Sequence, residues 1–181
     1  MPVAAMRSIA QLRIPPNALA MCQTAAQDAI AALRKASQTL KEDNANISYD
    51  DLAALQRYYL INEDDPEIGP RAAEIRRLIK ATKQGITNQQ ITVDYGHYNS
   101  AQRNTRTHVM YLGRDNFTRP NRLLRYFIHE ASHMYANTDD MAGYLNNNGT
   151  YRNPGVNQQS AANNADSLAC LVLALSFVAL E

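Results

Sequence analysis

Hydrophobic positions recur at three- and four-residue intervals along the first half of the chain, which is the spacing of amphipathic helices. An Ala- and Leu-rich stretch predicts a long helix over residues 17–40. A second helix is expected over 48–62, where Ser48 is placed to act as its N-cap. A third is expected over 66–83 and should stop at Gly85, because glycine commonly terminates helices.

The pattern changes to short apolar runs after Gly85. Residues 90–95 and 107–112 are predicted strands. A helix is then expected, with Thr118 as its cap and Pro120 in its first turn. Its predicted buried stripe consists of Leu123, Leu124, Phe127, Ile128 and Ala131.

The rest of the chain divides into a polar loop and an apolar helix. Residues 146–164 are dense in Asn, Gln and Gly and predict mostly loop, and a final helix is expected over about 161–180. The apolar run 168–180 is too short to span a bilayer, so it predicts a buried helix and no membrane insertion. The predicted fold class is α+β, mainly helical, with a small antiparallel sheet before the helix that carries His129 and His133.

Composition and charge narrow the class of protein. The 181 residues are 45% hydrophobic and 19% charged, which is typical of a globular protein of one domain. Lys and Arg number 18 and Asp and Glu 17, for a formal net charge of +1. This balance gives no reason to expect nucleic acid or an anionic membrane as a partner.

The two cysteines leave two interpretations open. Cys22 and Cys170 lie in apolar helical contexts far apart in the chain, and they can pair only if the first and last helices pack together. Two buried free thiols are the alternative. Neither cysteine has the spacing of a structural zinc site.

The segment His129-Glu130-Ala131-Ser132-His133 carries the clearest chemistry. On a helix, the HExxH spacing places both imidazoles on one face, where they can bind one metal ion. Glu130 then lies beside the metal as a candidate general base for a water molecule. The alternative is a chance match on an ordinary helix, but a capped amphipathic helix preceded by a strand is the context that this chemistry needs.

A catalytic zinc of this type needs three protein ligands, and elimination reduces the number of residues that could be the third ligand. No histidine follows His133, and the one later glutamate is the last residue, Glu181. The downstream candidates are therefore aspartates, namely Asp139, Asp140 and Asp166. Two upstream histidines remain as alternatives, namely His97 and His108.

Among the aspartates, Asp140 is favoured as the third ligand. The chain must reverse just after Ala136 for it to reach the metal, and Asn137 tolerates the left-handed conformation of such a turn. Asp139 is the alternative ligand. If Asp139 does not bind the metal, it is expected to be a solvated carboxylate in the turn. Asp166, on the final helix, is expected to orient a ligand histidine or a turn.

Together these motifs resemble the aspzincin metallopeptidases, the group of deuterolysin and peptidyl-Lys metallopeptidase. The HExxH motif is followed by Asn137-Thr138-Asp139-Asp140-x-x-Gly143-Tyr144, which resembles the family's turn with its ligand aspartate. Two further stretches are similar to the family, Tyr111-Leu112-Gly113-x-x-x-Phe117 before the metal helix and Asn164-Ala165-Asp166-Ser167 at the start of the last helix. The resemblance covers about residues 91–180.

The resemblance implies a zincin-like catalytic region over residues 86–181, with a helical N-terminal region over residues 1–85 packed on it in one compact domain. It implies one Zn²⁺ bound by His129, His133 and Asp140. Where the family usually has a tyrosine to stabilise the oxyanion, this chain has Gly143, so Tyr144 is the candidate donor. Asp166 matches a substrate-binding position of lysine-specific relatives, but Ala169 replaces their glutamate, so lysine specificity is not implied.

The expected function is hydrolysis of a peptide bond in a peptide or protein substrate, with Glu130 as general base. Strand 107–112 is a candidate to pair with an extended substrate, and the Asn-rich loop from Asn146 is a candidate wall of the cleft. One alternative is a zinc amidase acting on cell-wall peptide or isopeptide bonds, of the effector or toxin type. The other is a non-catalytic zincin-like interaction domain.

The compartment stays open. Residues 1–7 show no signal peptide, whereas the resembled family is best known from secreted enzymes. Delivery by a secretion system would reconcile the two, and a toxin of that kind would have a cognate inhibitor or immunity protein as its partner.

Overall fold

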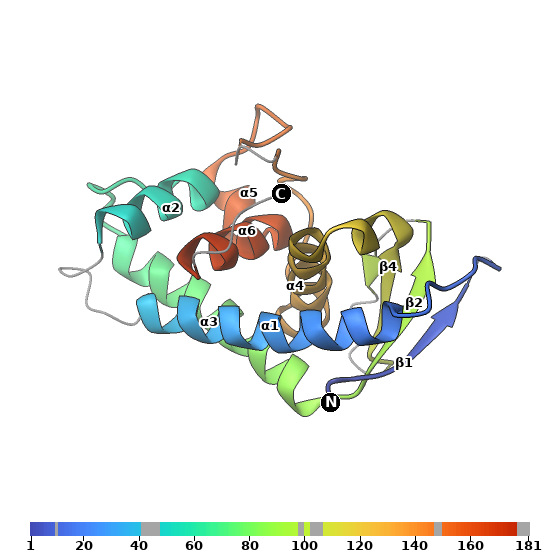
Figure 1. Cartoon of the computed structure of the whole chain (residues 1–181). Helices are drawn as coiled ribbons and strands as arrows, with labels where there is room; N and C mark the ends of the chain where they lie inside the picture. The colour runs from blue at the N-terminus through green and yellow to red at the C-terminus, as the bar shows by residue number, and fades with distance from the viewer. Residues whose placement is uncertain (10, 41–47, 98–99, 102–106, 147–149, 177–181) are drawn as a thin grey trace.

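The computed structural model describes all residues except 10, 41–47, 98–99, 102–106, 147–149 and 177–181. The fold is α+β and mainly helical, as predicted. A small sheet lies on one side of the molecule and most of the helices lie on the other, with α4 (Pro120–Ala136) between them (Figure 1).

The sheet has four strands in the order β1-β2-β4-β3, namely β1 (Val3–Ser8), β2 (Ile91–Gly96), β3 (Ser100–Ala101) and β4 (Val109–Gly113). The predicted strands are confirmed as β2 and β4, but the prediction of an antiparallel sheet is wrong. β1 pairs with β2 and β2 pairs with β4 in parallel, and only the two-residue β3 is antiparallel to β4. Along the chain β3 comes between β2 and β4 and runs opposite to both, so β4 has the same direction as β2.

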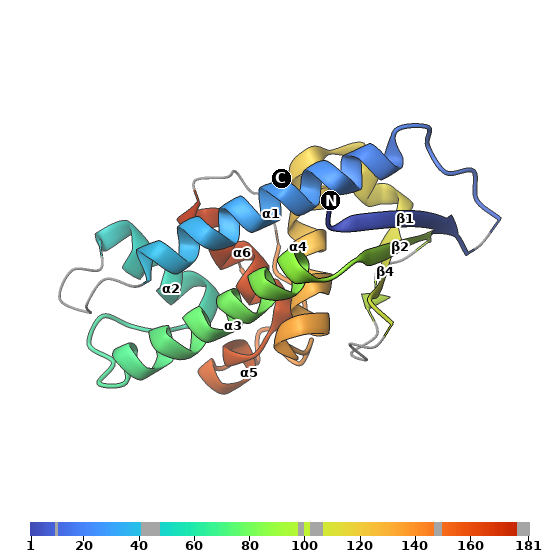
Figure 2. The same ribbon diagram turned by 90° about the horizontal axis from the view of Figure 1, so that it is seen from below.

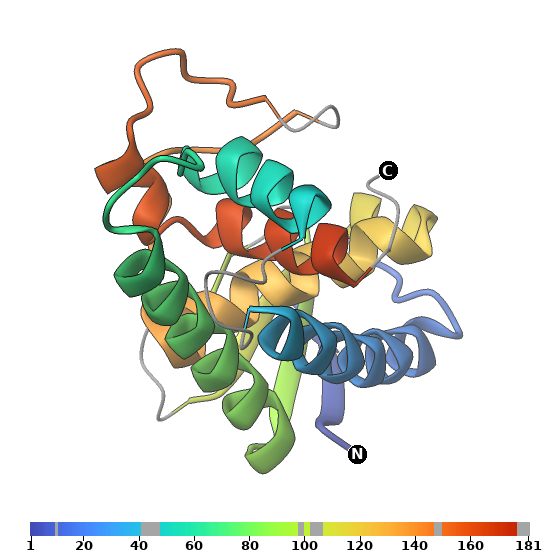
Figure 3. The ribbon, with the colours of Figure 1, turned by 90° about the vertical axis from the view of Figure 1, so that its left-hand side faces the viewer.

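The three helices predicted in the first half are present as α1 (Ala18–Thr39), α2 (Tyr49–Tyr59) and α3 (Ile68–Asn88). The Ser48 hydroxyl caps α2 by accepting a hydrogen bond from the Asp51 amide, as predicted. Figure 3 shows α4 enclosed by α1, α3 and α6 (Ala165–Leu175), and all three helices contact it. The N-terminal region also completes the sheet, because β1 lies beside both β2 and α1 (Figure 2).

Gly85 does not end the third helix, contrary to the prediction. The helix continues through it to Asn88, and a Cβ at Gly85 would overlap the ring of Tyr135 on α4. The glycine is therefore explained by the close approach of α3 to α4 and not by helix termination.

The start of α4 differs in detail from the prediction. Thr118 is not its cap, because it ends a 3₁₀ helix, η2 (Arg114–Thr118), where its hydroxyl donates to the Asp115 carbonyl. Pro120 is the first residue of α4, as predicted, and Arg119 precedes it as the N-cap residue. The helix ends at Asn137, which has the predicted left-handed conformation with φ 57° and ψ 37°.

The predicted polar loop contains a short helix, α5 (Gln158–Ala162). The final helix is confirmed as the buried α6, although it starts at Ala165 instead of 161, and residues 177–180 of the prediction lie outside the described residues. Cys22 and Cys170 are buried free thiols. None of the described helices combines the length and hydropathy needed to cross a membrane.

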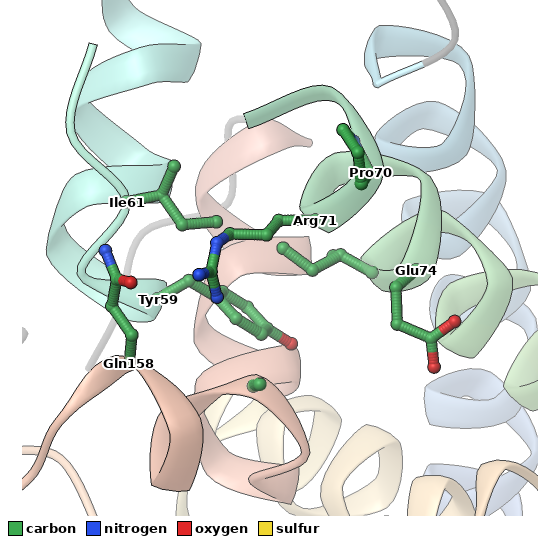
Figure 4. Close-up of a pocket in the computed structure, with 8 residues that line it drawn as sticks. Tyr59, Ile61, Pro70, Arg71, Glu74 and Gln158 are labelled. Atoms are coloured by element: carbon green, nitrogen blue, oxygen red, sulfur yellow. The ribbon is translucent and has the colours of Figure 1, made fainter. Parts of the chain in front are cut away.

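A cavity of about 240 Å³ lies between α2, α3 and α5 (Figure 4). Its walls are mostly apolar and include Ile61 and Ile75, and the polar side chains of Arg71 and Gln158 also line it. The ring of Tyr59 also lines it, while the Tyr59 hydroxyl is buried without a hydrogen-bond partner among the described residues. None of the predicted site residues lines this cavity.

Candidate metal centre

Three of the predicted ligand side chains converge at the C-terminal end of α4. The Nε2 atoms of His129 and His133 lie 3.2 Å apart. The two carboxylate oxygens of Asp140 each lie 3.3 Å from one of these nitrogens, Oδ1 from His129 and Oδ2 from His133. Both imidazoles are buried, whereas the Asp140 side chain is 47% exposed, so the cluster is open to solvent on the Asp140 side.

The spacing of these atoms fits a tetrahedral metal ion. With metal–ligand distances of about 2.0–2.1 Å, neighbouring ligand atoms of a tetrahedron are about 3.3 Å apart. The distance between the two Nε2 atoms is close to this value, and so is the distance from each Nε2 to the Asp140 oxygen that faces it, Oδ1 for His129 and Oδ2 for His133. Contacts with His129 and His133 also lower the pKa of Asp140, so its carboxylate is a negatively charged donor at neutral pH.

Local sequence explains how Asp140 reaches the histidines. The left-handed Asn137 turns the chain back directly after α4. The turn is then held against the start of α6, because the Asp139 amide donates to the Asn163 carbonyl and the Ala165 amide donates to the Asp139 carbonyl. The Asn164 side chain donates to the carbonyl of Gly143, which has a positive φ of 72°.

His133 is oriented by the same turn. Its Nδ1 lies 2.9 Å from the carbonyl oxygen of Thr138. A carbonyl only accepts, so Nδ1 carries the proton and the lone pair of Nε2 is left to bind a metal. Thr138 is itself fixed, because its hydroxyl is 2.7 Å from that of Ser132 on α4.

His129 faces a buried ion pair. Its Nδ1 is 3.6 Å from Asp166 Oδ1, beyond hydrogen-bond distance but directed at the carboxylate. Asp166 accepts hydrogen bonds from Arg125 Nε at 3.1 Å and Nη2 at 2.6 Å, and from the Leu145 amide at 2.6 Å. Burial opposes the charge of His129, but Asp140 and Asp166 outweigh it and raise its pKa to about 10.

Glu130 is a further titratable group beside the cluster. Its Oε1 is 3.9 Å from His129 Nε2, and its buried Oε2 has no hydrogen-bond partner among the described residues. The ligand atoms of His129, Glu130 and His133 lie within 4.8 Å of one another and could hold a metal ion. The Asp140 carboxylate is closer to His129 Nε2, at 3.3 Å, than the Glu130 carboxylate, at 3.9 Å. Burial raises the pKa of Glu130 to about 7, against the opposing charges of the histidines, and this value suits a general base.

Tyr144, the candidate oxyanion donor, lies against the cluster. Its ring stacks on the imidazole of His129, with centroids 5.5 Å apart and an interplanar angle of 12°. Burial is the main cause that raises the pKa of Tyr144 to about 12, so the phenol keeps its proton at neutral pH. A protonated phenol at this place can donate a hydrogen bond to a developing negative charge.

The other candidates from the sequence are not in the cluster. Asp139 accepts hydrogen bonds from the Met141 amide and from Asn163, which is the turn role left open for it. His97 is exposed, and the ring of His108 stacks on Tyr135. The predicted pairing of a substrate with strand 107–112 has little room at Met110 and Tyr111, because β4 is bonded to β2 on one side and β3 on the other.

Sequence reasoning missed two residues that support the cluster. Arg125 lies one turn before His129 on α4, and an arginine on a stripe of buried positions could have indicated a buried carboxylate partner. The carbonyl of Thr138 leaves no signal in the sequence, because any residue supplies one.

Comparison with known proteins adds no family to this description. No family model matches the chain, and no curated protein matches it in sequence. The chemistry of the cluster therefore rests on its own geometry.

Proposed function

We propose that this protein is a zinc-dependent metallopeptidase of the aspzincin type, which hydrolyses peptide bonds with His129, His133 and Asp140 as zinc ligands. The observation that carries the proposal is the convergence of two imidazole nitrogens and one carboxylate at the edge length of a zinc tetrahedron. Glu130 supports catalysis, because its buried Oε2 has no hydrogen-bond partner among the described residues and a purely structural zinc site has no use for a base.

The residues around the cluster have distinct roles in this reaction. Bound zinc would polarise the scissile carbonyl and lower the pKa of a water molecule to about 7. Glu130 accepts the proton of the attacking water and returns it to the leaving amine, for which its pKa of about 7 is suited. Tyr144 donates its phenolic proton in a hydrogen bond to the carbonyl oxygen as negative charge develops there.

Metal analysis and a peptide screen test the proposal together. The purified protein should contain one zinc per chain and cleave members of a diverse peptide library. The donor set of two histidines and one carboxylate also suits non-haem iron, so the analysis must identify the metal. Zinc with cleavage of cell-wall peptides alone would favour an amidase, and a metal-free, inactive protein would contradict the proposal.

Three variants separate the roles of neighbouring carboxylates. Glu130→Gln should keep zinc and lose hydrolysis, because the amide cannot accept the proton. Asp140→Ala should lose both zinc and activity. Asp139→Asn is the matched control, because its side chain caps the turn from outside the cluster and should keep both. Stoichiometric zinc in Asp140→Ala would refute the ligand assignment.

A further inference from the structure

Arg122 and Arg152 flank the aromatic rings that contact His129, and the buried Arg125 also lies 5.8 Å from the Tyr126 ring. The Arg152 guanidinium lies 6.0 Å from the ring centroid of Tyr144, which stacks on the imidazole. The Arg122 guanidinium lies 5.9 Å from the ring of Tyr126, whose centroid is 6.1 Å from that of the same imidazole. The candidate metal centre thus has two adjacent tyrosines, each with a cation beside it.

The backbone fixes both arginines in these positions. Arg122, Tyr126 and His129 follow one another at helical spacing on α4, so they share one stripe of that helix. Arg152 is tied to the other tyrosine by a hydrogen bond from its amide to the Tyr144 carbonyl at 3.1 Å.

The segment that carries Arg152 is anchored to the core. Leu145 and Tyr151 form an antiparallel bridge beside it. The Tyr151 hydroxyl donates to the Tyr58 carbonyl at 2.6 Å and lies 2.7 Å from the Ser167 hydroxyl. The backbone that positions Arg152 is therefore held on α2 and α6.

The charge of these arginines is not neutralised by the described residues of the chain. Neither Arg122 nor Arg152 forms an ion pair with a described residue, whereas Arg125 is buried and paired with Asp166. Arg152 is exposed and Arg122 half-buried, so both reach solvent. Stacking on a ring uses the face of a guanidinium and leaves its N–H edges free to bind a carboxylate.

We propose that Arg122 and Arg152, each beside a ring that contacts His129, are binding positions for carboxylate groups of the substrate, so that the enzyme prefers peptides with an acidic group near the scissile bond. This inference rests on the proposed peptidase function. The carboxylate comes either from an acidic side chain or from the C-terminus of the substrate. Both sources present the same planar anion to the guanidinium edge.

Matched peptides test the preference. A set of Ala-based peptides carries either Glu or Gln at each position in turn, with blocked ends, and a second set compares a free C-terminal carboxylate with an amide. The zinc-loaded protein should cleave the best carboxylate peptide about tenfold faster in kcat/KM than its neutral partner. If the arginines bind an acidic side chain, the tenfold ratio of kcat/KM appears in the first set of peptides. If they bind the C-terminal carboxylate, it appears in the second set.

Charge variants assign the preference to these residues. Arg122→Gln and Arg152→Gln should each lower the ratio, and Arg152→Glu should favour a Lys peptide over the Gln peptide. Arg13→Gln, which removes an exposed arginine between β1 and α1, is the matched control and should keep the ratio. A ratio that persists in both arginine variants would overturn the proposal.

Failure of the carboxylate site can be distinguished from failure of the proposed peptidase function. Equal cleavage of charged and neutral peptides overturns the carboxylate site and leaves the peptidase in place. If no peptide is cleaved, calorimetric binding of the same pairs to the zinc-loaded Glu130→Gln protein decides. A tenfold preference in Kd that is lost in Arg152→Gln supports the carboxylate site, and equal Kd values overturn it.

Discussion

Replacing Arg125 by methionine removes the guanidinium that pairs with the buried Asp166 carboxylate. The side chains of the pair are 6% and 0% exposed, and the carboxylate receives two hydrogen bonds from the guanidinium. Removal of one partner of a buried ion pair costs about 3–5 kcal/mol. For a protein with about 5–15 kcal/mol of stability this is a large fraction, and it corresponds to a fall in Tm of roughly 6–20 °C.

The assay is urea unfolding at pH 7, with a double-mutant cycle of Arg125→Met and Asp166→Asn. The pKa of Asp166 is lowered, so its stabilising contribution is complete above the unfolded-state pKa of about 3.9 and is lost as the pH falls through the folded-state value. At pH 7 the measurement therefore reports the ionised pair. The double variant should be less destabilised than the sum of the single variants by about 1–3 kcal/mol.

An exposed pair provides the control. Arg77 and Glu74 on α3 form the same type of contact, but their side chains are 62% and 52% exposed. Arg77→Met should therefore cost no more than about 1 kcal/mol. An equal cost for Arg125→Met and Arg77→Met would refute the buried role of Arg125. Asp166→Asn should also weaken zinc binding about 10- to 100-fold, because Asp166 faces the Nδ1 of His129.

Three more predictions follow from individual contacts. The pKa of His129 is raised to about 10, so zinc must compete with a proton for this imidazole at neutral pH. Zinc affinity, measured by competition with a chelating dye, should therefore rise about tenfold per pH unit from pH 7 towards pH 10. An affinity that does not change with pH would contradict this prediction. Gly85→Ala should lower the urea-unfolding free energy by about 1–3 kcal/mol despite better helix propensity, because its Cβ overlaps Tyr135, and a gain would show that the ring can move. Tyr59→Phe should leave the free energy of unfolding unchanged or raise it, because the Tyr59 hydroxyl has no hydrogen-bond partner among the described residues. Tyr151→Phe should lower it by about 1–3 kcal/mol, because the Tyr151 hydroxyl contacts two partners. The reverse order would be inconsistent with these contacts.

The sequence predicted those elements whose own pattern is strong. The long helices are present, and the chain turns at Asn137 in the left-handed conformation that an asparagine tolerates. β1 was missed because only Val3 of its six residues is buried, so the strand has no alternating pattern. The direction of the sheet was wrong because two strands separated by a short polar stretch resemble a hairpin, and the two residues of β3 carry no pattern of their own.

The candidate site shows the same division between local and non-local information. The spacing of His129 and His133 is a property of one helix, so it is visible in the sequence. The approach of Arg125 to Asp166 joins residues 41 positions apart and depends on how α4 packs on α6. Such a pair is fixed by packing, and a single sequence without that packing does not indicate it.

The start of α6 links these levels. The Asn164 side chain donates a hydrogen bond to the Gly143 carbonyl, and Asp166 accepts one from the Leu145 amide. The Ser167 hydroxyl lies at hydrogen-bond distance from the Tyr151 hydroxyl. Asn164, Asp166 and the amide of Ala165, which donates to the Asp139 carbonyl, thus hold the segment that carries Asp140 and Tyr144. The stretch is better explained as a scaffold for the turn after α4 than as a contact for substrate. Its substitution should therefore reduce stability and metal affinity together, whereas substitution of Arg152 should change substrate preference alone.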